Sequence, residues 1–381
     1  MRGVKAVGLA ILISVMGFWI PANNVQAQEY SVSARAAVVY DPQSDTVLYE
    51  VRGQEQLPMA STTKIMTAYL VLESAELSDW RVTVSETAVS QEGSSSGLKA
   101  GDVIRLSDLA ACMLLASGNE AAVAGAEAVA GSEEAFVARM NEQAKAWGLT
   151  DTHFNTASGL DGETHYTTAR DLAKLASHAM ENEAFCALWS AKEQKVSVQG
   201  VDGTMRTISL TNHNKLLWQM EGCIGGKTGY TQKSGRCLVS CAEREGARLI
   251  AVTLHDPDDW SDHEALMTYG FSQMTRLTVK ETEAVATVTT QDGGSFQAVP
   301  AQEEIGFVLP KEKQNVVRQV NCPIPQTTPT EGDTVGQIEY WLQEKKIGQI
   351  SLVARQVVAP PENLPWWEEG WQALLSFLGL A

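Results

Sequence analysis

Residues 57–72 read LPMASTTKIMTAYLVL, a short polar turn followed by a strongly apolar helical stretch. Ser61 lies three residues before Lys64, so at helical spacing the two side chains share one face, one turn apart. A serine hydroxyl becomes an effective nucleophile when a neighbouring base takes its proton. A lysine can be that base where burial or another positive charge lowers its pKa. The stretch therefore predicts a serine nucleophile with a lysine base on a buried helix.

Two further polar motifs follow in the chain. Residues 117–119, Ser-Gly-Asn, lie in a predicted break between two helices, where a hydroxyl and an amide can project into a cleft. Residues 227–229, Lys-Thr-Gly, begin a predicted strand. There the lysine can hold a carboxylate, the threonine can hydrogen-bond it, and the glycine lets a ligand approach the strand edge. A lone S-x-x-K is expected about once by chance at this length, whereas the three motifs in this order are a specific signature.

The elements around these motifs predict a sheet that is built from both ends of the first 270 residues. Strand patterns at 36–40 and 46–51 flank a turn cluster, and strand patterns at 236–242 and 248–254 flank a second turn. The region between them reads as mainly helical, so we expect an antiparallel sheet with helices packed on it. The helical periodicity covers residues from 58 onwards, 103–148 (with separate helices at 107–115, 121–130 and 133–147) and 171–180.

From about Leu277 the chain becomes rich in strands, which predicts a small sandwich or barrel-like domain. The tail at 360–381 carries Trp366, Trp367 and Trp371 on one predicted helical face with three leucines. Such a face favours an interfacial membrane anchor, with a helix docked on the β domain as the alternative. The strands are expected at 285–290, 296–299, 305–309, 316–320, 338–342 and 349–354.

The N-terminus has the three parts of a secretory signal peptide. Arg2 and Lys5 form a positive start, residues 6–20 are apolar, and small residues at 25–27 form a cleavage site. The apolar run is shorter than the roughly 20 residues that a spanning helix needs. We therefore expect residues 1–27 to be removed and the mature protein to work outside the cytoplasm; an uncleaved membrane anchor is the alternative.

Composition excludes several classes of protein. The 381 residues are 44% hydrophobic and 20% charged, which is typical of a globular protein and not of a fibrous or disordered one. The formal net charge of −17 argues against a nucleic-acid-binding surface. The six cysteines form no CxxC pair, and so no zinc pattern. Cys237 and Cys241 would lie about 13 Å apart on one side of a strand, too far for a disulfide.

The motifs and their flanks resemble the low-molecular-mass penicillin-binding proteins that are serine-type D-alanyl-D-alanine carboxypeptidases. The resemblance is dense over about 33–270 and looser beyond. It implies an α/β (α+β) fold: an antiparallel sheet with helices on both faces and a helical lobe, as in β-lactamases and transpeptidases, then a small all-β domain and a C-terminal amphipathic helix. The implied division is 1–27 signal peptide, 28–276 penicillin-binding serine peptidase domain, 277–359 β-rich domain and 360–381 tail.

The resemblance also implies a reaction. Ser61 would attack the carbonyl between the two D-alanines that end the peptidoglycan stem peptide, with Lys64 as the general base. No metal or organic cofactor is expected, because the nucleophile, the base and the oxyanion donors are protein groups. The expected partners are the stem peptide and β-lactams, with peripheral membrane contact through the tail. Among the remaining site residues, Ser117 and Asn119 would relay a proton and hold the substrate amide, and Lys227 and Thr228 would bind the carboxylate. Gly229 would let the substrate lie against the strand edge, and the backbone N–H of Tyr230, with that of Ser61, would bind the oxyanion.

The sequence departs from the family pattern near the end of the sheet and in the acidic residues Glu368 and Glu369 of the tail, and it leaves two alternatives open. Many relatives carry a basic residue a few positions past the last strand of the sheet, which helps to hold the substrate carboxylate, but residues 256–263 here are acidic, with His263 as the candidate substitute. His165 and His213 are expected to be structural. A β-lactamase would have the same acylation apparatus, although Glu163 lacks the context of its deacylating glutamate. A non-catalytic scaffold that binds wall peptide is the second alternative.

Overall fold

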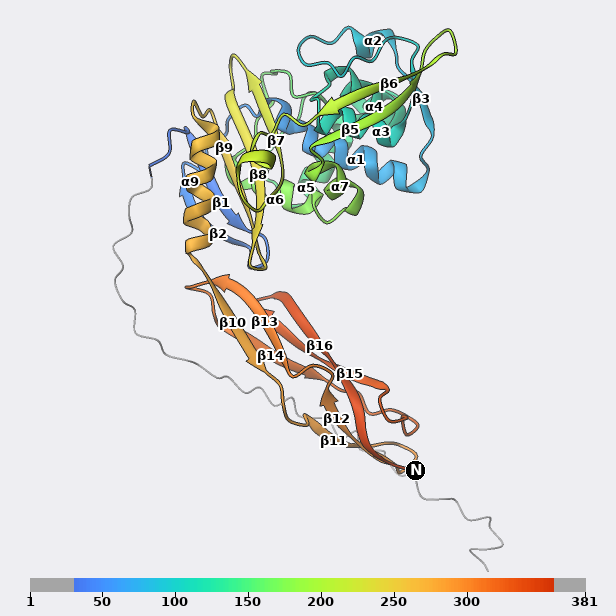
Figure 1. The fold of residues 1–381 in the computed structure, drawn as a ribbon, viewed down its shortest axis with the longest axis vertical. Helices are drawn as coiled ribbons and strands as arrows, with labels where there is room; N and C mark the ends of the chain where they lie inside the picture. The colour runs from blue at the N-terminus through green and yellow to red at the C-terminus, as the bar shows by residue number, and fades with distance from the viewer. Residues whose placement is uncertain (1–30, 360–381) are drawn as a thin grey trace, which may run out of the picture. The chain divides into compact units, whose positions relative to one another are not determined.

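The computed structural model describes residues 31–359, which divide into two compact units, each with its own sheet (Figure 1). Of the described chain, residues 31–275 and 308–311 form the first unit, and residues 276–307 and 312–359 form the second. The signal peptide predicted at 1–27 and the tail helix predicted at 360–381 lie outside the described residues.

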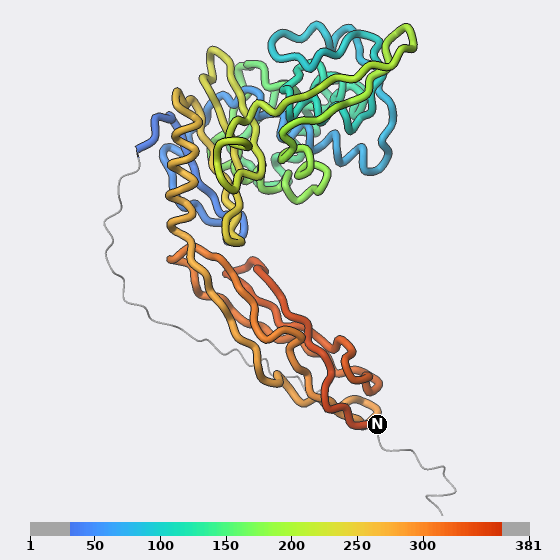
Figure 2. The backbone as a smooth tube through the Cα atoms, viewed as in Figure 1, coloured from blue at the N-terminus to red at the C-terminus, as the bar shows by residue number. Residues whose placement is uncertain are grey.

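A five-stranded antiparallel sheet forms the centre of the first unit, and it joins the two ends of this part of the chain as predicted. Figure 2 shows the early strands, in blue, beside the later strands, in yellow. The last strand in the spatial order, β7, is an edge strand. In that order the strands are β2 (Thr46–Val51), β1 (Ala36–Asp41), β9 (Ala247–Leu254), β8 (Gly235–Arg244) and β7 (Cys223–Thr231).

Alternate residues of this sheet enter two different hydrophobic cores, because successive side chains of a strand point to opposite faces. Val38 packs with the helical lobe on one face, while Val39 packs on the other face with Leu266. Both faces are thus covered, which confirms the predicted arrangement of helices on both sides. The helix α6 (Ala169–Ala179) lies against the first face of the sheet. The helices α9 (Asp259–Ser272) and α8 (Leu216–Gln219) pack on the second face.

The helical lobe is built around α1, which follows a short 3-10 turn, η1, and is buried through most of its first nine residues. Over residues 64–72 the helix has no exposed polar face, so this part is covered by its neighbours. The helices of the lobe are η1 (Ala60–Thr63), α1 (Lys64–Leu77), α2 (Glu86–Val89), α3 (Leu106–Leu114), α4 (Asn119–Ala130), α5 (Glu133–Ala146) and α7 (Glu183–Ser190).

The lobe also contains a small antiparallel sheet that the sequence analysis missed, and this corrects the purely helical interpretation of residues 103–148. Residues 103–105 form a strand, because the β-branched Val103 and Ile104 pair with β3 before the first helix begins. Two of the strands are only three residues long, which is too short for a periodic signal. The order is β3 (Arg81–Thr83), β4 (Val103–Arg105), β5 (Glu193–Gln199) and β6 (Met205–Thr211).

The second unit is all-β, as predicted. It combines a five-stranded antiparallel sheet with a two-stranded ribbon, and the rings of Phe307 and Tyr340 lie 5.3 Å apart in its core. In the sheet the order is β11 (Ala286–Thr289), β12 (Ser295–Pro300), β16 (Lys345–Val358), β15 (Thr334–Leu342) and β14 (Val316–Asn321), and the ribbon pairs β10 (Met274–Lys280) with β13 (Glu304–Pro310).

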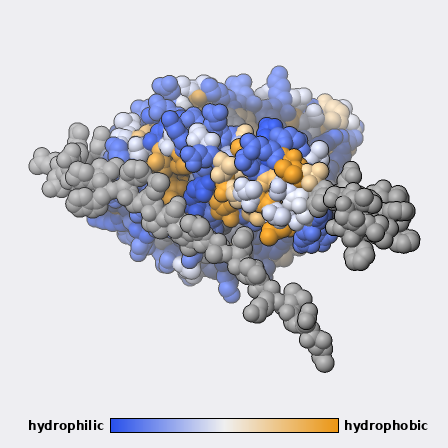
Figure 3. All heavy atoms as spheres, turned by 90° about the horizontal axis from the view of Figure 1, so that it is seen from below, coloured by the Kyte–Doolittle hydropathy of each residue, from blue (hydrophilic) through white to orange (hydrophobic). Residues whose placement is uncertain are grey.

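The surface and the cysteines fit the composition. The face in Figure 3 shows hydrophilic side chains interrupted by small apolar groups. All six cysteines are free thiols, and Cys237 and Cys241 are buried on the same face of β8 without a disulfide, as their spacing predicts. Within residues 31–359 there is no helix with the length and apolar character needed to cross a bilayer.

Candidate active site

Ser61 lies in the 3-10 turn that precedes α1. The preceding residue, Ala60, has a left-handed backbone (φ 48°), and the two threonines after Ser61 brace the turn. The hydroxyl of Thr62 donates to the carbonyl of Met59 (2.6 Å), and that of Thr63 donates to the carbonyl of Ala60 (2.8 Å). Both threonine side chains are buried while Ser61 borders a cavity, so the sequence around Ser61 holds its hydroxyl toward open space.

Lys64 is the first residue of α1, and its side chain is completely buried. Its Nζ lies 2.9 Å from Ser61 Oγ, 2.7 Å from Asn119 Oδ1 and 2.6 Å from the carbonyl oxygen of Ser158. Burial removes the hydration of an ammonium group, so the pKa of Lys64 lies well below its ordinary value, and the charge of Lys227 lowers it further. The structure therefore places a readily deprotonated amine against the Ser61 hydroxyl.

Ser117 and Lys227 form a second contact at the same site. Lys227 Nζ donates to Ser117 Oγ (3.0 Å) and to the carbonyl oxygen of Thr228 (2.9 Å). Ser117 has a left-handed backbone (φ 60°) at the break before α4, and its side chain lines the cavity. Lys227 is also fully buried, and the loss of hydration lowers its pKa to about 7.

The edge strand β7 passes close to the nucleophile turn. A Cβ atom on Gly229 would lie 3.0 Å from both the carbonyl oxygen of Met59 and the backbone nitrogen of Ser61, so a larger residue would force the strand away by a few tenths of an ångström. As β7 pairs with β8 on one side only, its other edge is available to a peptide as an added strand. Tyr230 follows Gly229 on this strand and lines the cavity.

Residues 155–165, between α5 and α6, support the nucleophile turn. His165 Nδ1 accepts the backbone N–H of Asn155 (2.9 Å), so a neutral ring carries its proton on Nε2 and donates it to Thr63 Oγ1 (2.8 Å). Burial lowers the pKa of His165 to about 4, which keeps the ring neutral. Gly159, at φ +88°, is required here because a Cβ would lie 2.1 Å from the carbonyl oxygen of Ala60.

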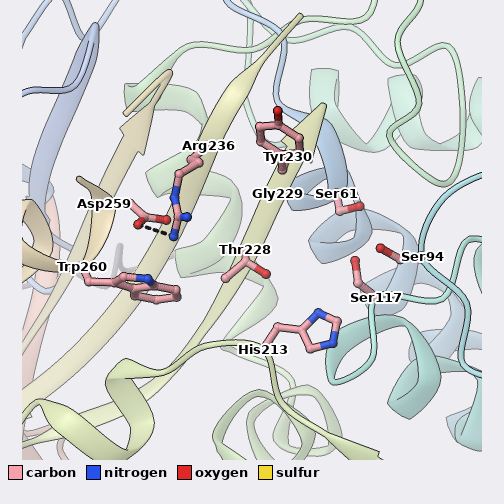
Figure 4. A pocket seen from close by; sticks show the side chains of 10 residues that line it. All are labelled: Ser61, Ser94, Ser117, His213, Thr228, Gly229, Tyr230, Arg236, Asp259 and Trp260. Atoms are coloured by element: carbon pink, nitrogen blue, oxygen red, sulfur yellow. Dashed lines mark hydrogen bonds and ion pairs between the residues drawn. The ribbon is translucent and has the colours of Figure 1, made fainter. Parts of the chain in front are cut away.

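A cavity of about 450 Å³ is bordered by Ser61, Ser117 and residues 228–230 of β7, and Figure 4 shows the side chains that line it. Six of its residues come from outside the three motifs: Ser94 between α2 and β4, His213 before α8, Tyr230 directly after the third motif, Arg236 on β8, and two from the start of α9. Figure 4 shows the Arg236 guanidinium between Asp259 and the ring of Trp260. The lining residues are Ser61, Ser94, Ser117, His213, Thr228, Gly229, Tyr230, Arg236, Asp259 and Trp260.

The histidines correct one hypothesis. His263 is fully buried on α9, bonded to Ser240 Oγ (2.6 Å) and Thr253 Oγ1 (3.0 Å), so it does not reach the cavity and cannot replace a basic ligand. Burial lowers its pKa to about 3. His213, expected to be structural, lines the cavity, and its pKa is lowered by burial and by the charge of Lys227.

Among residues 31–359 no group of three or more His, Cys, Asp or Glu side chains could hold a metal ion. The arrangement of hydroxyl, buried amine, amide and edge strand is that of a serine enzyme that transfers an acyl group. Its catalytic unit matches the model of the D-alanyl-D-alanine carboxypeptidase family over residues 22–258. The chain belongs to this family, and it is a serine-type D-Ala-D-Ala carboxypeptidase.

The sequences and structures of several named proteins match this chain over most of their length. The chain is 31% identical to D-alanyl-D-alanine carboxypeptidase DacF of Bacillus subtilis over 376 residues, which span 94% of this chain and 92% of the relative. It is 31% identical to DacC of Escherichia coli over 378 residues, with the same coverage. Among solved structures, DacD from Francisella tularensis matches with a TM-score of 0.63 and 26% identity, covering 90% of this chain and 97% of that one. A Streptomyces DD-transpeptidase matches with a TM-score of 0.62 and 31% identity, covering 65% of this chain and 100% of that one.

Proposed function

We propose that the enzyme removes the terminal D-alanine of peptidoglycan stem pentapeptides through an acyl-enzyme on Ser61. The Ser61 oxygen attacks the carbonyl carbon between the two D-alanines, and Lys64 takes the hydroxyl proton. The proton then passes through Ser117 to the nitrogen of the departing D-alanine as the peptide bond breaks. Water completes the cycle: it loses a proton to Lys64, attacks the ester, and the Ser61 oxygen is reprotonated.

The contacts of Lys64 are the observation that carries this proposal. The carbonyl of Ser158 and the amide oxygen of Asn119 accept two hydrogens from Nζ. A neutral amine has just two hydrogens, so its lone pair is left for the third neighbour, Ser61 Oγ at 2.9 Å. A lysine that is neutral in this position is a base aimed at the serine proton.

The remaining motif residues hold the substrate in this proposal. The backbone N–H groups of Ser61 and Tyr230 stabilise the oxyanion. The close approach of Gly229 to the nucleophile turn supports this role, because it brings the two segments together. Asn119 holds the substrate amide, and Lys227 with Thr228 holds the terminal carboxylate. All of these are protein groups, so the mechanism requires no metal or organic cofactor.

The proposed setting is outside the cytoplasm. Residues 1–27 would be removed as a signal peptide, residues 28–276 would act as the peptidase, residues 277–359 would form the β-rich domain, and residues 360–381 would contact the membrane peripherally. The stem peptide of the wall and β-lactams are the proposed ligands, and benzylpenicillin would acylate Ser61 and leave slowly.

Intact-mass spectrometry of the mature protein with benzylpenicillin, followed over time, tests the proposal together with an assay of D-alanine release from a D-Ala-D-Ala peptide. We expect a long-lived adduct on the peptide that contains Ser61, and steady release of D-alanine. The Ser61→Ala variant should form no adduct and release no D-alanine.

Two other outcomes would replace the proposal. Rapid turnover of benzylpenicillin with little peptide cleavage would make the protein a β-lactamase; Glu163, the glutamate in the comparable segment, is exposed and does not line the cavity. If no adduct formed and no D-alanine were released, the protein would be a scaffold that binds wall peptide.

A further inference from the structure

A substrate that ends in a carboxylate brings a full negative charge into the cavity, and Lys227 is poorly placed to neutralise it alone. Its Nζ is buried and already donates to Ser117 Oγ and to the carbonyl oxygen of Thr228. Burial also lowers its pKa to about 7, so its positive charge is less secure than that of an exposed lysine. A second cation would therefore strengthen the binding of a carboxylate.

Arg236 is the one residue among the described cavity-lining set that carries a permanent positive charge. It lies on β8 directly opposite Tyr230 of β7, so the pairing of these two strands fixes its position beside the substrate edge. Its side chain is 43% exposed, and Figure 4 shows the guanidinium at the end of the cavity near Thr228.

Two residues at the start of α9 hold this guanidinium. Asp259 Oδ1 accepts from Nη2 at 2.6 Å, and the Asp259 side chain is itself only 4% exposed. The centre of the guanidinium lies 5.7 Å from the ring centroid of Trp260, within the range of a cation–π contact. Within the described residues, Nε and Nη1 of Arg236 have no hydrogen-bond partner, so one edge of the fork is free for a ligand.

We propose that Arg236, oriented by Asp259 and Trp260, binds the terminal carboxylate of the substrate and makes the enzyme selective for peptides that end in a free carboxylate. This inference rests on the proposed function, because it concerns the same cavity. A guanidinium can bind a carboxylate through two parallel N–H donors, which gives direction as well as charge. In a peptide whose C-terminus is blocked or cross-linked, that partner is absent.

The test compares two peptides that differ only at the C-terminus: an acyl-D-Ala-D-Ala peptide and its terminal carboxamide. The wild-type enzyme should cleave the carboxylate peptide with the higher kcat/KM. In Arg236→Gln we expect this kcat/KM to fall about tenfold to a hundredfold, since a charge-assisted hydrogen bond is lost. The kcat/KM for the carboxamide should change about threefold or less, so the preference collapses.

Arg248 offers a matched control. It lies on β9, its side chain is 46% exposed, and it pairs with Glu243 at 3.0 Å, so it resembles Arg236 in exposure and pairing but does not line the cavity. Arg248→Gln should leave both rates and the preference unchanged. Asp259→Asn should weaken the preference less than Arg236→Gln, because the cation remains but loses its orienting partner.

The proposal is overturned if Arg236→Gln lowers both kcat/KM values equally, or lowers neither. Acylation of Ser61 by an activated ester without a carboxylate separates this result from a failure of the proposed function. Arg236→Gln should acylate with that ester at the wild-type rate, and a large loss would show general damage to the site and also overturn the proposal. If instead Ser61→Ala still released D-alanine, the proposed function would fail, whatever Arg236 does.

Discussion

Two kinds of cation lie at the active site, and their surroundings are opposite. Lys64 and Lys227 are fully buried, and the loss of hydration lowers the pKa of each. Arg236 is partly exposed and is paired with Asp259. Burial suits a group that must gain and lose a proton, whereas exposure and a carboxylate partner suit a group that must stay charged. The comparison indicates that the base, Lys64, lies deep in the site, whereas the permanent charge of Arg236 lies near the surface.

Exchanging the two kinds of cation should have the largest effect. In Lys64→Arg the side chain keeps its positive charge but cannot give up its proton at neutral pH. We expect acylation by benzylpenicillin to slow by about 10³-fold or more, as for the loss of a base from a catalytic unit that acts as a whole. Mass spectrometry of samples quenched at set times measures this rate. A loss of less than tenfold would show that Lys64 is not the base.

Lys227→Gln removes the like charge that helps to lower the pKa of Lys64. Without it the pKa of Lys64 rises, so the acid limb of the pH profile of acylation should move to higher pH. We expect the rate at pH 7 to fall by about a hundredfold, because the variant also loses the donor to Ser117. An acid limb that stays in place, or moves to lower pH, would contradict the coupling between the two lysines.

Gly229→Ala tests the approach of β7 to the nucleophile turn. The new Cβ would lie 3.0 Å from Ser61 N, so the strand must move by a few tenths of an ångström. A shift of this kind at an oxyanion site should lower kcat about tenfold to a hundredfold. Binding of an uncleaved D-Ala-D-Ala analogue should change less. Gly306→Ala, on β13 and outside the cavity lining, is the control for added methyl groups, because its Cβ would meet only the flexible end of Arg276, at 3.3 Å. Equal activity of Gly229→Ala and wild type would refute the close approach.

Glu120 should have a smaller effect, because it acts through a loop. Its buried Oε1 accepts from Ser95 Oγ (2.8 Å), Ser96 Oγ (2.8 Å) and the backbone N–H groups of Ser96 (2.6 Å) and Gly97 (3.1 Å), next to Ser94 at the cavity. Glu120→Gln weakens these charge-assisted bonds, so we expect KM to rise about threefold to tenfold. It also removes the charge that raises the pKa of Lys64, so the acid limb should move to lower pH. Glu120→Asp keeps the charge but has a shorter side chain, so its pH profile should be closer to that of the wild type than its KM is.

The smallest expected effect concerns stability. The pKa of Lys227 is about 7 in the folded protein and 10.5 ordinarily, so between these values the unfolded chain binds one more proton. The buried lysine therefore costs stability most below pH 7 and least above pH 10.5. Lys227→Met should be more stable than wild type near pH 7, and the difference should shrink by about 1 kcal/mol per pH unit above pH 7.5. Urea unfolding at pH 7.5 and 8.5 measures it; a pH-independent difference would contradict the lowered pKa.

Much of the fold could be predicted because strong local patterns coincide with its main elements. The strands at 36–40 and 248–254 carry β-branched runs bounded by turn residues, and the structure pairs them as neighbours. The small sheet of the lobe was missed because β3 and β4 are three residues each and depend on tertiary pairing. The helix α9 was not predicted because Asp259 and Asp262, in its first turn, are buried, so its buried face does not read as apolar in the sequence.

The motif residues of the site could be named from sequence because their spacing is characteristic, but the carboxylate ligand could not. Arg236 lies in no motif, and it reaches the cavity through the register that sets it opposite Tyr230. Asp259 and Trp260 approach it from the start of α9. The short turn between Tyr230 and Arg236 was the available signal, since a tight hairpin places such residues opposite each other.

The pH dependence of wild-type acylation by benzylpenicillin, measured in single turnover, tests the central claim most directly. If Lys64 is a buried amine with a strongly lowered pKa, the rate at pH 7 should lie within about threefold of its plateau at higher pH. A rate that climbs about tenfold per pH unit from pH 7 toward 10 would show a lysine of ordinary pKa and would contradict the account.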